Sequence, residues 1–156
     1  DGTIRLSSAT GNQPAIVLRG HSGAVNEARW SPRQVNLLMS VSGDLTARLW
    51  DDRTTGNASA IISPHESLMV SDLLSLDWNK YDEWNVCTAT TSDLLFWDLR
   101  SLARGPVNRI PGAHRRAIKR VRFSPWQGNR LTSVGFDMSL RSWDLTALNP
   151  RGSHFE

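Results

Sequence analysis

Short runs of alternating apolar and polar residues, separated by turn residues, recur along the chain. In residues 46–50, Thr-Ala-Arg-Leu-Trp, every second side chain can face the same side of a sheet. Because no stretch combines a helical period with helix caps, the pattern predicts an all-β chain. Each unit is expected to contain four short antiparallel strands, which around His21 lie at residues 15–18, 24–30, 37–41 and 46–50.

A fixed set of residues repeats with the strands. Three pairs of histidine and tryptophan mark the repeats: His21 with Trp50, His65 with Trp97, and His114 with Trp143. Each tryptophan is followed by aspartate, and successive tryptophans lie 47 and 46 positions apart. The first and third pairs each span 29 positions, and the middle pair spans 32. These spacings are close to the ~40–45 residues of a WD-repeat propeller blade, so they predict a partial β-propeller of about three blades.

The middle repeat is irregular. About four residues are inserted between His65 and Trp78, relative to the interval from His21 to Trp30. The insertion lies near residues 68–72. We expect this blade to be the least rigid of the three.

The repeats resemble WD blades in a further respect, because those blades contain a buried network of histidine, serine or threonine, turn aspartate and tryptophan. A buried imidazole or carboxylate must be paired, and tryptophan adds apolar area and one N–H donor. The predicted sets are His21, Ser40, Asp44 and Trp50; His65, Thr88 and Trp97; and His114, Ser133, Asp137 and Trp143. In the middle set Asp93 lies four positions before the tryptophan instead of six, and Thr91 or Ser92 is a candidate replacement for the carboxylate.

The recurrence of serine, histidine and aspartate also raises the alternative of a hydrolase triad. A triad needs one exposed nucleophile with an oxyanion hole. Here the same trio occurs at least twice at the blade spacing, which indicates a scaffold. The sequence contains no Gly-x-Ser-x-Gly elbow, Walker loop or metal-spaced Cys/His cluster. We therefore predict no catalytic residue, no metal and no cofactor.

Composition narrows the class of protein further. The 156 residues are 39% hydrophobic and 21% charged, which permits a packed core. The net charge of +3 is too small to indicate nucleic acid, and strand alternation divides the basic residues between Arg115 and Arg122 over two faces. The one cysteine, Cys87, fits a reducing compartment and is interpreted as a core residue. Without a long apolar run or a signal peptide, no membrane insertion is predicted.

Four segments carry a closer resemblance. They are residues 61–65 (Ile-Ile-Ser-Pro-His), 76–83 (Leu-Asp-Trp-Asn-Lys-Tyr-Asp-Glu), 97–100 (Trp-Asp-Leu-Arg) and 114–126 (His-Arg-Arg-Ala-Ile-Lys-Arg-Val-Arg-Phe-Ser-Pro-Trp). Together they look like consecutive blades of the peroxisomal targeting signal type 2 receptor family, from about Leu18 to Leu145. With that family in view, residues 15–147 are expected to form three WD repeats of a seven-bladed propeller. Residues 1–8 would end a preceding blade, and residues 148–156 would be a linker or a truncated next blade, so we expect a fragment.

The resemblance implies a non-catalytic import receptor that shuttles between the cytosol and the peroxisome matrix. Its cargo proteins would carry an N-terminal type 2 targeting signal, a short basic amphipathic helix. Its other partners would be a co-receptor peroxin and docking proteins, but no nucleic acid. A rigid propeller groove suits the apolar stripe of such a helix, with acidic groups for its cations. The alternative is another WD-repeat adaptor, such as a histone-binding chromatin propeller, although those proteins lack the Lys80-Tyr81 segment.

Candidate groove residues flank the histidine loops and the aspartate turns. They are Glu66 as an acidic contact, Leu68 and Met69 as apolar contacts, Gly43 and Phe136 beside the aspartate turns, and Arg115 and Arg116 on the same rim. The alternative interpretation is that Glu66 is a solvated loop charge and that Phe136 packs against its own blade, because most surface-loop residues contribute little binding energy.

Overall fold

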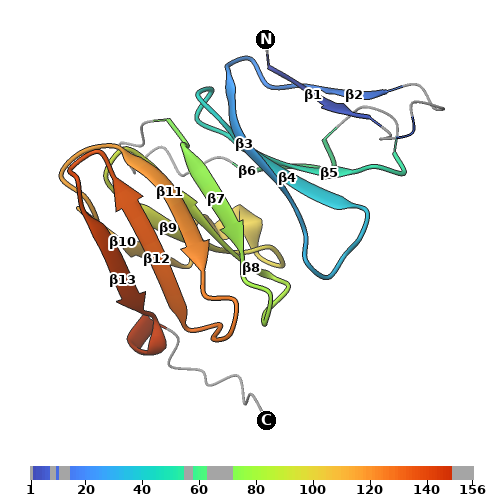
Figure 1. The fold of residues 1–156 in the computed structure, drawn as a ribbon. Coiled ribbons are helices and arrows are strands. Elements are labelled where there is room, and N and C mark those ends of the chain that lie inside the picture. Colours follow the sequence, from blue (N-terminus) through green and yellow to red (C-terminus); the bar gives the residue numbers. More distant parts are fainter. Residues whose placement is uncertain (1, 8–9, 11–14, 55–57, 63–71, 149–156) are drawn as a thin grey trace.

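The computed structural model describes residues 2–7, 10, 15–54, 58–62 and 72–148, and its strands form four antiparallel sheets (Figure 1). The sheets contain β1 (Thr3–Leu6) and β2 (Ile16–Arg19); β3 (Val25–Trp30), β4 (Leu37–Ser42), β5 (Ala47–Asp51) and β6 (Ala60–Ile62); β7 (Ser75–Trp78), β8 (Asn85–Ala89), β9 (Leu94–Asp98) and β10 (Asn108–Ile110); and β11 (Ile118–Phe123), β12 (Arg130–Gly135) and β13 (Leu140–Asp144). Short 3-10 helices at Leu102–Arg104 and Thr146–Leu148 follow β9 and β13. No α-helix occurs in the described ranges, which confirms the all-β prediction. Likewise, none of the described helices could cross a membrane.

Each sheet is shifted by one strand relative to the predicted repeat unit. The sequence pattern groups β2 with β3, β4 and β5 around His21, whereas β2 pairs with β1, where Leu18 lies opposite Ile4. The outer strand of the second sheet is β6, whose Ile62 lies opposite Ala47 of β5. The turn at His21 separates β2 from β3, so the strand before the turn closes the preceding sheet. One repeat therefore links two neighbouring sheets through the covalent chain.

The inner strands β3, β7 and β11 lie next to one another and run in the same direction. Ser75 at the start of β7 bonds to Glu27, and Trp78 at its end bonds to Arg29 further along β3. The bonds between β7 and β11 follow the same order. The turns before β3 and β11 and the turns after β4 and β12 therefore lie at one end, the histidine end (residues 20–24, 43–46, 112–117 and 136–139). The loops after β3, β7 and β11 lie at the opposite end, the loop end (residues 31–36, 79–84 and 124–129).

The apolar core lies between neighbouring sheets. Met39 and Val41 of the second sheet belong to one buried cluster with Leu76 of the third. A second cluster joins Cys87 of the third sheet to Val121 of the fourth. Each fully buried aliphatic side chain contributes about 1.5–3 kcal/mol, so the sheets stabilise one another. The Cys87 thiol is part of this core, and burial raises its pKa well above the ordinary value.

Three turn residues in equivalent positions have a left-handed backbone. Gly2, Leu45 and Met138 have φ angles of 68°, 67° and 61°, and each follows an aspartate. This conformation favours glycine, because a Cβ atom crowds the backbone there. Leu45 and Met138 therefore hold strain that the first copy of the turn avoids.

Replacing Met138 with glycine is expected to raise the free energy of unfolding by about 0.5–1 kcal/mol. The Met138 side chain is 97% exposed, so its removal relieves the turn and loses little packing. Urea denaturation measures the difference. Leu140→Gly is the control, because Leu140 is also exposed but lies in β13, where glycine weakens a strand. A Met138→Gly protein that is less stable than the parent would contradict the strain.

Candidate functional site

The first predicted set, His21, Ser40, Asp44 and Trp50, forms one hydrogen-bonded tetrad. His21 Nδ1 lies 2.8 Å from Asp44 Oδ2, and His21 Nε2 lies 2.7 Å from Ser40 Oγ. The indole N–H of Trp50 donates to Ser40 Oγ at 2.9 Å. Because a carboxylate only accepts, Nδ1 carries the imidazole proton and Nε2 accepts the serine hydroxyl. The bonds therefore run in one direction, from Trp50 through Ser40 and His21 to Asp44.

The third set, His114, Ser133, Asp137 and Trp143, repeats this geometry. His114 Nδ1 lies 2.9 Å from Asp137 Oδ1, and His114 Nε2 lies 2.7 Å from Ser133 Oγ. Trp143 donates its indole N–H to Ser133 Oγ at 2.9 Å. In both tetrads the serine is at most 1% exposed, and its hydroxyl lies between the imidazole and the indole. The serine of each trio is therefore buried, whereas a hydrolase triad needs an exposed nucleophile.

The middle set is organised differently. The indole of Trp97 still donates to Thr88 Oγ1 at 2.8 Å. Asp93 accepts the hydroxyl of Ser92 at 2.8 Å and pairs with Arg109 of β10 at 2.9 Å. This carboxylate therefore connects its turn to the outer strand. The histidine of the set, His65, lies outside the described residues.

Burial and hydrogen bonding set the protonation of the first tetrad. Burial lowers the pKa of His21 and outweighs the bond to Asp44, so the imidazole is neutral. Burial alone would raise the pKa of Asp44, but hydrogen bonds from Thr46, His21 and Ser22 hold it well below the ordinary value. The pKa of Asp137 is also well below its usual range, mainly because of the hydrogen bond from His114.

Stability is expected to fall as the pH is lowered from about 7 to about 5, and again below about 4. The folded pKa of His21 is below the unfolded value, so the unfolded chain binds a proton first as the pH falls through about 6.5. Asp44 and Asp137 also lower the stability as the pH falls, in their case near pH 4, because their pKa values are lower in the folded protein than in the unfolded chain. Urea midpoints measured across this range test the expectation. An equal midpoint at about pH 7.5 and about pH 5.5 would contradict a neutral, buried His21.

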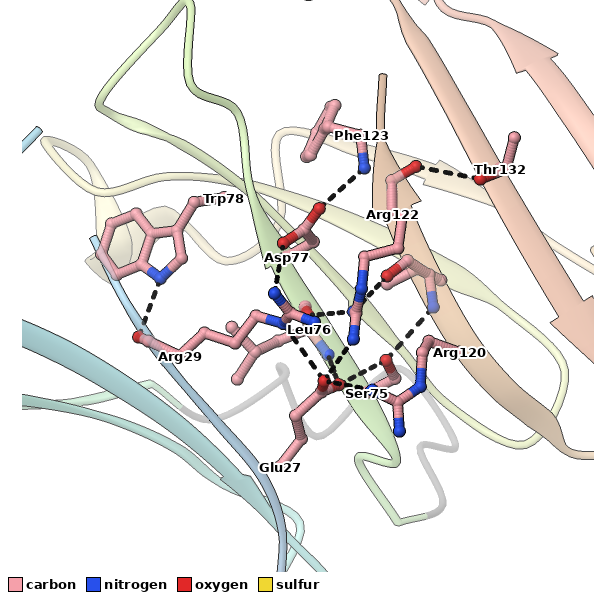
Figure 2. A network of polar contacts seen from close by, with 11 residues as sticks. Glu27, Arg29, Ser75, Leu76, Asp77, Trp78, Arg120, Arg122, Phe123 and Thr132 are labelled. Carbon is pink, nitrogen blue, oxygen red and sulfur yellow. Dashed lines mark hydrogen bonds and ion pairs between the residues drawn. The ribbon is translucent and has the colours of Figure 1, made fainter. Parts of the chain in front are cut away.

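Glu27 on β3 is the centre of a polar network that joins three inner strands (Figure 2). Its Oε1 atom accepts hydrogen bonds from Arg29 at 3.1 Å, Arg120 at 3.1 Å and Arg122 at 2.7 Å. Its Oε2 atom accepts the hydroxyl of Ser75 at 2.6 Å and the next backbone N–H at 3.0 Å. The Glu27 side chain is only 11% exposed, whereas the Arg120 side chain is 52% exposed, so the bond to Arg120 is the least shielded from water. One carboxylate therefore holds three sheets in register.

A second carboxylate, Asp77, continues the network along β7 (Figure 2). Asp77 Oδ2 accepts the backbone N–H of Phe123 at 2.8 Å, and Oδ1 lies 3.7 Å from the guanidinium of Arg29. Trp78 donates its indole N–H to the carbonyl of Arg29 at 3.0 Å. Burial raises the pKa of Asp77 and is only partly offset by these partners. The strand β7 is thus bonded on one side to β3 and on the other to β11.

The sequence contains a signal for this network that periodicity within one repeat does not reveal. The inner strands share the order polar, apolar, polar, aromatic at residues 27–30 (Glu-Ala-Arg-Trp), 75–78 (Ser-Leu-Asp-Trp) and 120–123 (Arg-Val-Arg-Phe). In the sequence pattern alone, Arg120 and Arg122 belong to a basic stretch that alternation divides between two faces. Two positions apart on one strand, they face the same side and reach the same carboxylate.

Two of the candidate groove positions lie near different aspartate turns at the histidine end. A methyl group at Gly43 would lie 3.7 Å from the carboxylate of Asp72. Asp72 is exposed and makes no side-chain hydrogen bond or ion pair among the described residues. Phe136 is 60% exposed, and Lys119 Nζ of β11 in the same sheet lies 6.0 Å from its ring centre.

Of the other five candidate groove residues, two lie within the described residues and three lie outside them. Arg115 and Arg116 are exposed beside the second tetrad, where the backbone N–H of Arg115 donates to Asp137 at 3.1 Å. Glu66, Leu68 and Met69 lie outside the described residues. Asp72 is not among the predicted groove residues, because in the sequence it marks only the end of the insertion. No group of three or more His, Cys, Asp or Glu in the described ranges could hold a metal ion.

Comparisons with known proteins agree with this geometry. Residues 12–51 match the family model "WD domain, G-beta repeat". The peroxisomal targeting signal 2 receptor of Saccharomyces cerevisiae is 32% identical over 138 residues, which cover 76% of this chain and 36% of the receptor. An uncharacterized WD repeat-containing protein of Schizosaccharomyces pombe is 31% identical over 160 residues, covering 96% of this chain and 28% of that protein. The F-box-like/WD repeat-containing protein TBL1X of Homo sapiens is 28% identical over 153 residues, covering 92% and 25%.

The chain therefore spans about a third or less of the length of these relatives. The matched segment, residues 12–51, contains the whole first tetrad from His21 to Trp50. The second tetrad repeats the geometry 93 residues later, on three antiparallel strands in the same order. Together, the family match, the sheets and the tetrads identify the chain as a WD-repeat protein with the fold of a partial β-propeller.

Proposed function

We propose that this chain is part of a receptor that binds the N-terminal type 2 peroxisomal targeting signal of cargo proteins. The observation that carries the proposal is the 32% identity with the yeast peroxisomal targeting signal 2 receptor across 76% of the chain. The segments behind the sequence resemblance also have a structural role here. Tyr81 donates its hydroxyl to the carbonyl of Pro125 at 3.0 Å, and Asn79 donates to the carbonyl of Gly128 at 2.9 Å. These bonds join two neighbouring blades.

The histidine end offers the chemistry that a basic amphipathic helix needs. Asp72 supplies an exposed negative charge without a partner among the described residues, and Phe136 supplies an exposed apolar ring. Arg115 and Arg116 make the neighbouring rim basic, which repels the cations of the ligand from that blade. We therefore expect the helix to place its basic side near Asp72 and its apolar stripe towards Phe136. The tetrads keep this surface rigid, which reduces the entropy lost on binding.

The proposed receptor acts without catalysis, cofactor or metal. Its partners are cargo proteins, a co-receptor peroxin and docking proteins, and its sites of action are the cytosol and the peroxisome matrix. The alternative function is that of another WD-repeat adaptor. The 28% identity with TBL1X across 92% of the chain supports this alternative. A basic histone tail would also need acidic contacts, so the two roles are separated by the ligand that binds.

A fluorescent type 2 signal peptide, titrated into the full chain, tests the proposal. We expect saturable binding that Asp72→Lys weakens by about tenfold at low salt, because a favourable charge becomes a repulsive one. Glu83→Lys is the matched control, since it makes the same charge reversal at the loop end. Equal affinity of the Asp72→Lys protein would contradict the site. Binding of a histone-tail peptide with no binding of the signal peptide would contradict the receptor role.

A further inference from the structure

A surface that combines cations with exposed apolar side chains lies at the histidine end of the fourth sheet. It is formed by the turn before β11, the start of β11 and the turn between β12 and β13, and we call it the fourth-sheet rim (Arg115, Arg116, Lys119, Phe136 and Met138). We propose that this rim binds an acidic segment of a partner protein, whose apolar anchor covers Met138. The proposal does not rest on the targeting-signal role, because that role requires a ligand of the opposite charge.

The positive charges of the rim have no counter-charge in the described part of the chain. The side chains of Arg115, Arg116 and Lys119 are exposed and make no ion pair or hydrogen bond with another described residue. The nearby carboxylates already have partners. Asp137 lies 3.7 Å from the guanidinium of Arg141, and Asp93 pairs with Arg109 at 2.9 Å. Carboxylates of a ligand would therefore meet cations that need not first be released from another group.

Met138 supplies the place for an apolar anchor. Its side chain is 97% exposed, and the ring of Phe136 beside it is also exposed. The backbone of Met138 is left-handed, with a φ angle of 61°, a conformation in which glycine would relieve the strain. Backbone strain of this kind clusters at positions that contact ligands, so a large apolar side chain at this strained position points to binding. Methionine is flexible and polarizable, and it adapts to the apolar side chain of a partner.

The two turns of the rim are held together before any ligand binds. The backbone N–H of Phe136 donates to the carbonyl of Ala117 at 2.9 Å, and the backbone N–H of Arg115 donates to Asp137 at 3.1 Å. Lys119 Nζ lies 6.0 Å from the centre of the Phe136 ring, so a cation and an apolar ring stand together. A surface that is already ordered binds a segment with a smaller entropic cost than one that must assemble.

Two other anionic partners match the rim less well than a protein segment. An anionic membrane would lie flat over the histidine end, where the exposed carboxylate of Asp72 would meet headgroups of the same charge. A nucleic acid strand needs cations that follow its phosphates and free aromatic rings on which its bases stack, whereas the ring of Phe136 already faces Lys119. A short acidic segment with one apolar side chain can pair with the cations of a single blade.

The test selects peptides of about 12 residues from a random library displayed on phage, with the full chain as the target. The library is first depleted on the Arg115→Gln/Arg116→Gln protein, so that the peptides retained depend on the rim. We expect sequences rich in Asp and Glu around one large apolar residue. Once synthesised, these peptides should bind the Arg115→Gln/Arg116→Gln protein about tenfold more weakly than the parent, and the Met138→Ala protein about threefold more weakly.

Three controls accompany the titrations. Arg104→Gln removes an exposed positive charge from the 3-10 helix after β9 and should leave the Kd unchanged. The Arg115→Gln/Arg116→Gln protein should unfold at the same urea concentration as the parent, because both side chains are exposed and have no partner among the described residues. Asp72→Lys should not weaken the acidic peptides, although it is expected to weaken the targeting-signal peptide, so the two proposals can fail separately.

Four outcomes would overturn the proposal. The first is that no peptide survives the depletion, or that the survivors contain no excess of Asp and Glu. The second is an unchanged Kd with Met138→Ala. The third is binding of phosphatidylserine vesicles or of a single-stranded oligonucleotide that is tighter than binding of the peptides and is lost in the Arg115→Gln/Arg116→Gln protein. The fourth is a concentration-dependent dimer, detected by light scattering and lost in the same variant, because the occupant would then be a second copy of the chain.

Discussion

Replacing Glu27 with alanine is expected to lower the free energy of unfolding by about 3–5 kcal/mol, the largest effect of any single change that we foresee. The substitution leaves Arg29, Arg120 and Arg122 around a position from which the negative charge has been removed. It also removes the acceptor for the Ser75 hydroxyl. The three guanidinium groups would then repel one another between sheets that they now hold together.

Urea denaturation of the parent and the Glu27→Ala protein measures this effect. Glu83→Ala is the matched control, because Glu83 makes no side-chain hydrogen bond or ion pair in the described part of the chain. Glu27→Gln is expected to fall between them, since an amide oxygen still accepts hydrogen bonds but carries no charge. If Glu27→Ala and Glu83→Ala unfold at the same urea concentration, the carboxylate does not join the sheets.

Replacing Ser40 with alanine is expected to lower the free energy of unfolding by about 2–4 kcal/mol. The hydroxyl is fully buried and serves two partners, so its removal leaves His21 Nε2 and the indole N–H of Trp50 unsatisfied. The smaller side chain adds almost no cavity. The loss therefore measures the hydrogen bonds and not the packing.

Thermal or urea denaturation gives the size of the loss, and Ser142→Ala supplies the comparison. Ser142 is exposed on β13 and makes no side-chain hydrogen bond within the described ranges, so its removal should change stability by less than about 0.5 kcal/mol. Ser133→Ala should cost somewhat less than Ser40→Ala, because Trp143 is less buried than Trp50. A Ser40→Ala protein as stable as the Ser142→Ala protein would show that the tetrad does not hold its blade together.

The tetrads could be predicted from the sequence because all their members belong to one repeat. A fixed spacing such as His21 to Trp50 is maintained by three consecutive strands, β3 to β5, and the turn before them, so residues close in the sequence are also close in space. Pairing between repeats does not follow from spacing in this way. The assignment of β2 to the first sheet and the network around Glu27 both depend on which strands lie next to one another in space.

The polar residues of the inner strands illustrate the same limit at the level of single side chains. Ser75 and Arg122 lie 48 and 95 positions from Glu27, yet both bond to its carboxylate. Within β11, alternation correctly places Arg120 and Arg122 on one face, but it cannot say that a glutamate of another sheet stands opposite. The partner of Asp93 could not be predicted from the repeat either. That partner is Arg109 of the outer strand β10 and not a residue of a histidine loop.

The most direct test of the central claim is hydrogen exchange of the backbone amides, measured on the full chain with and without a type 2 signal peptide. The claim is that the repeated histidine, serine and tryptophan residues hold a rigid scaffold, whose histidine end receives the ligand. It predicts slower exchange on binding at residues 43–46 and 136–139, with no change at residues 79–84 of the loop end. Protection confined to the loop end, or no protection anywhere, would contradict it.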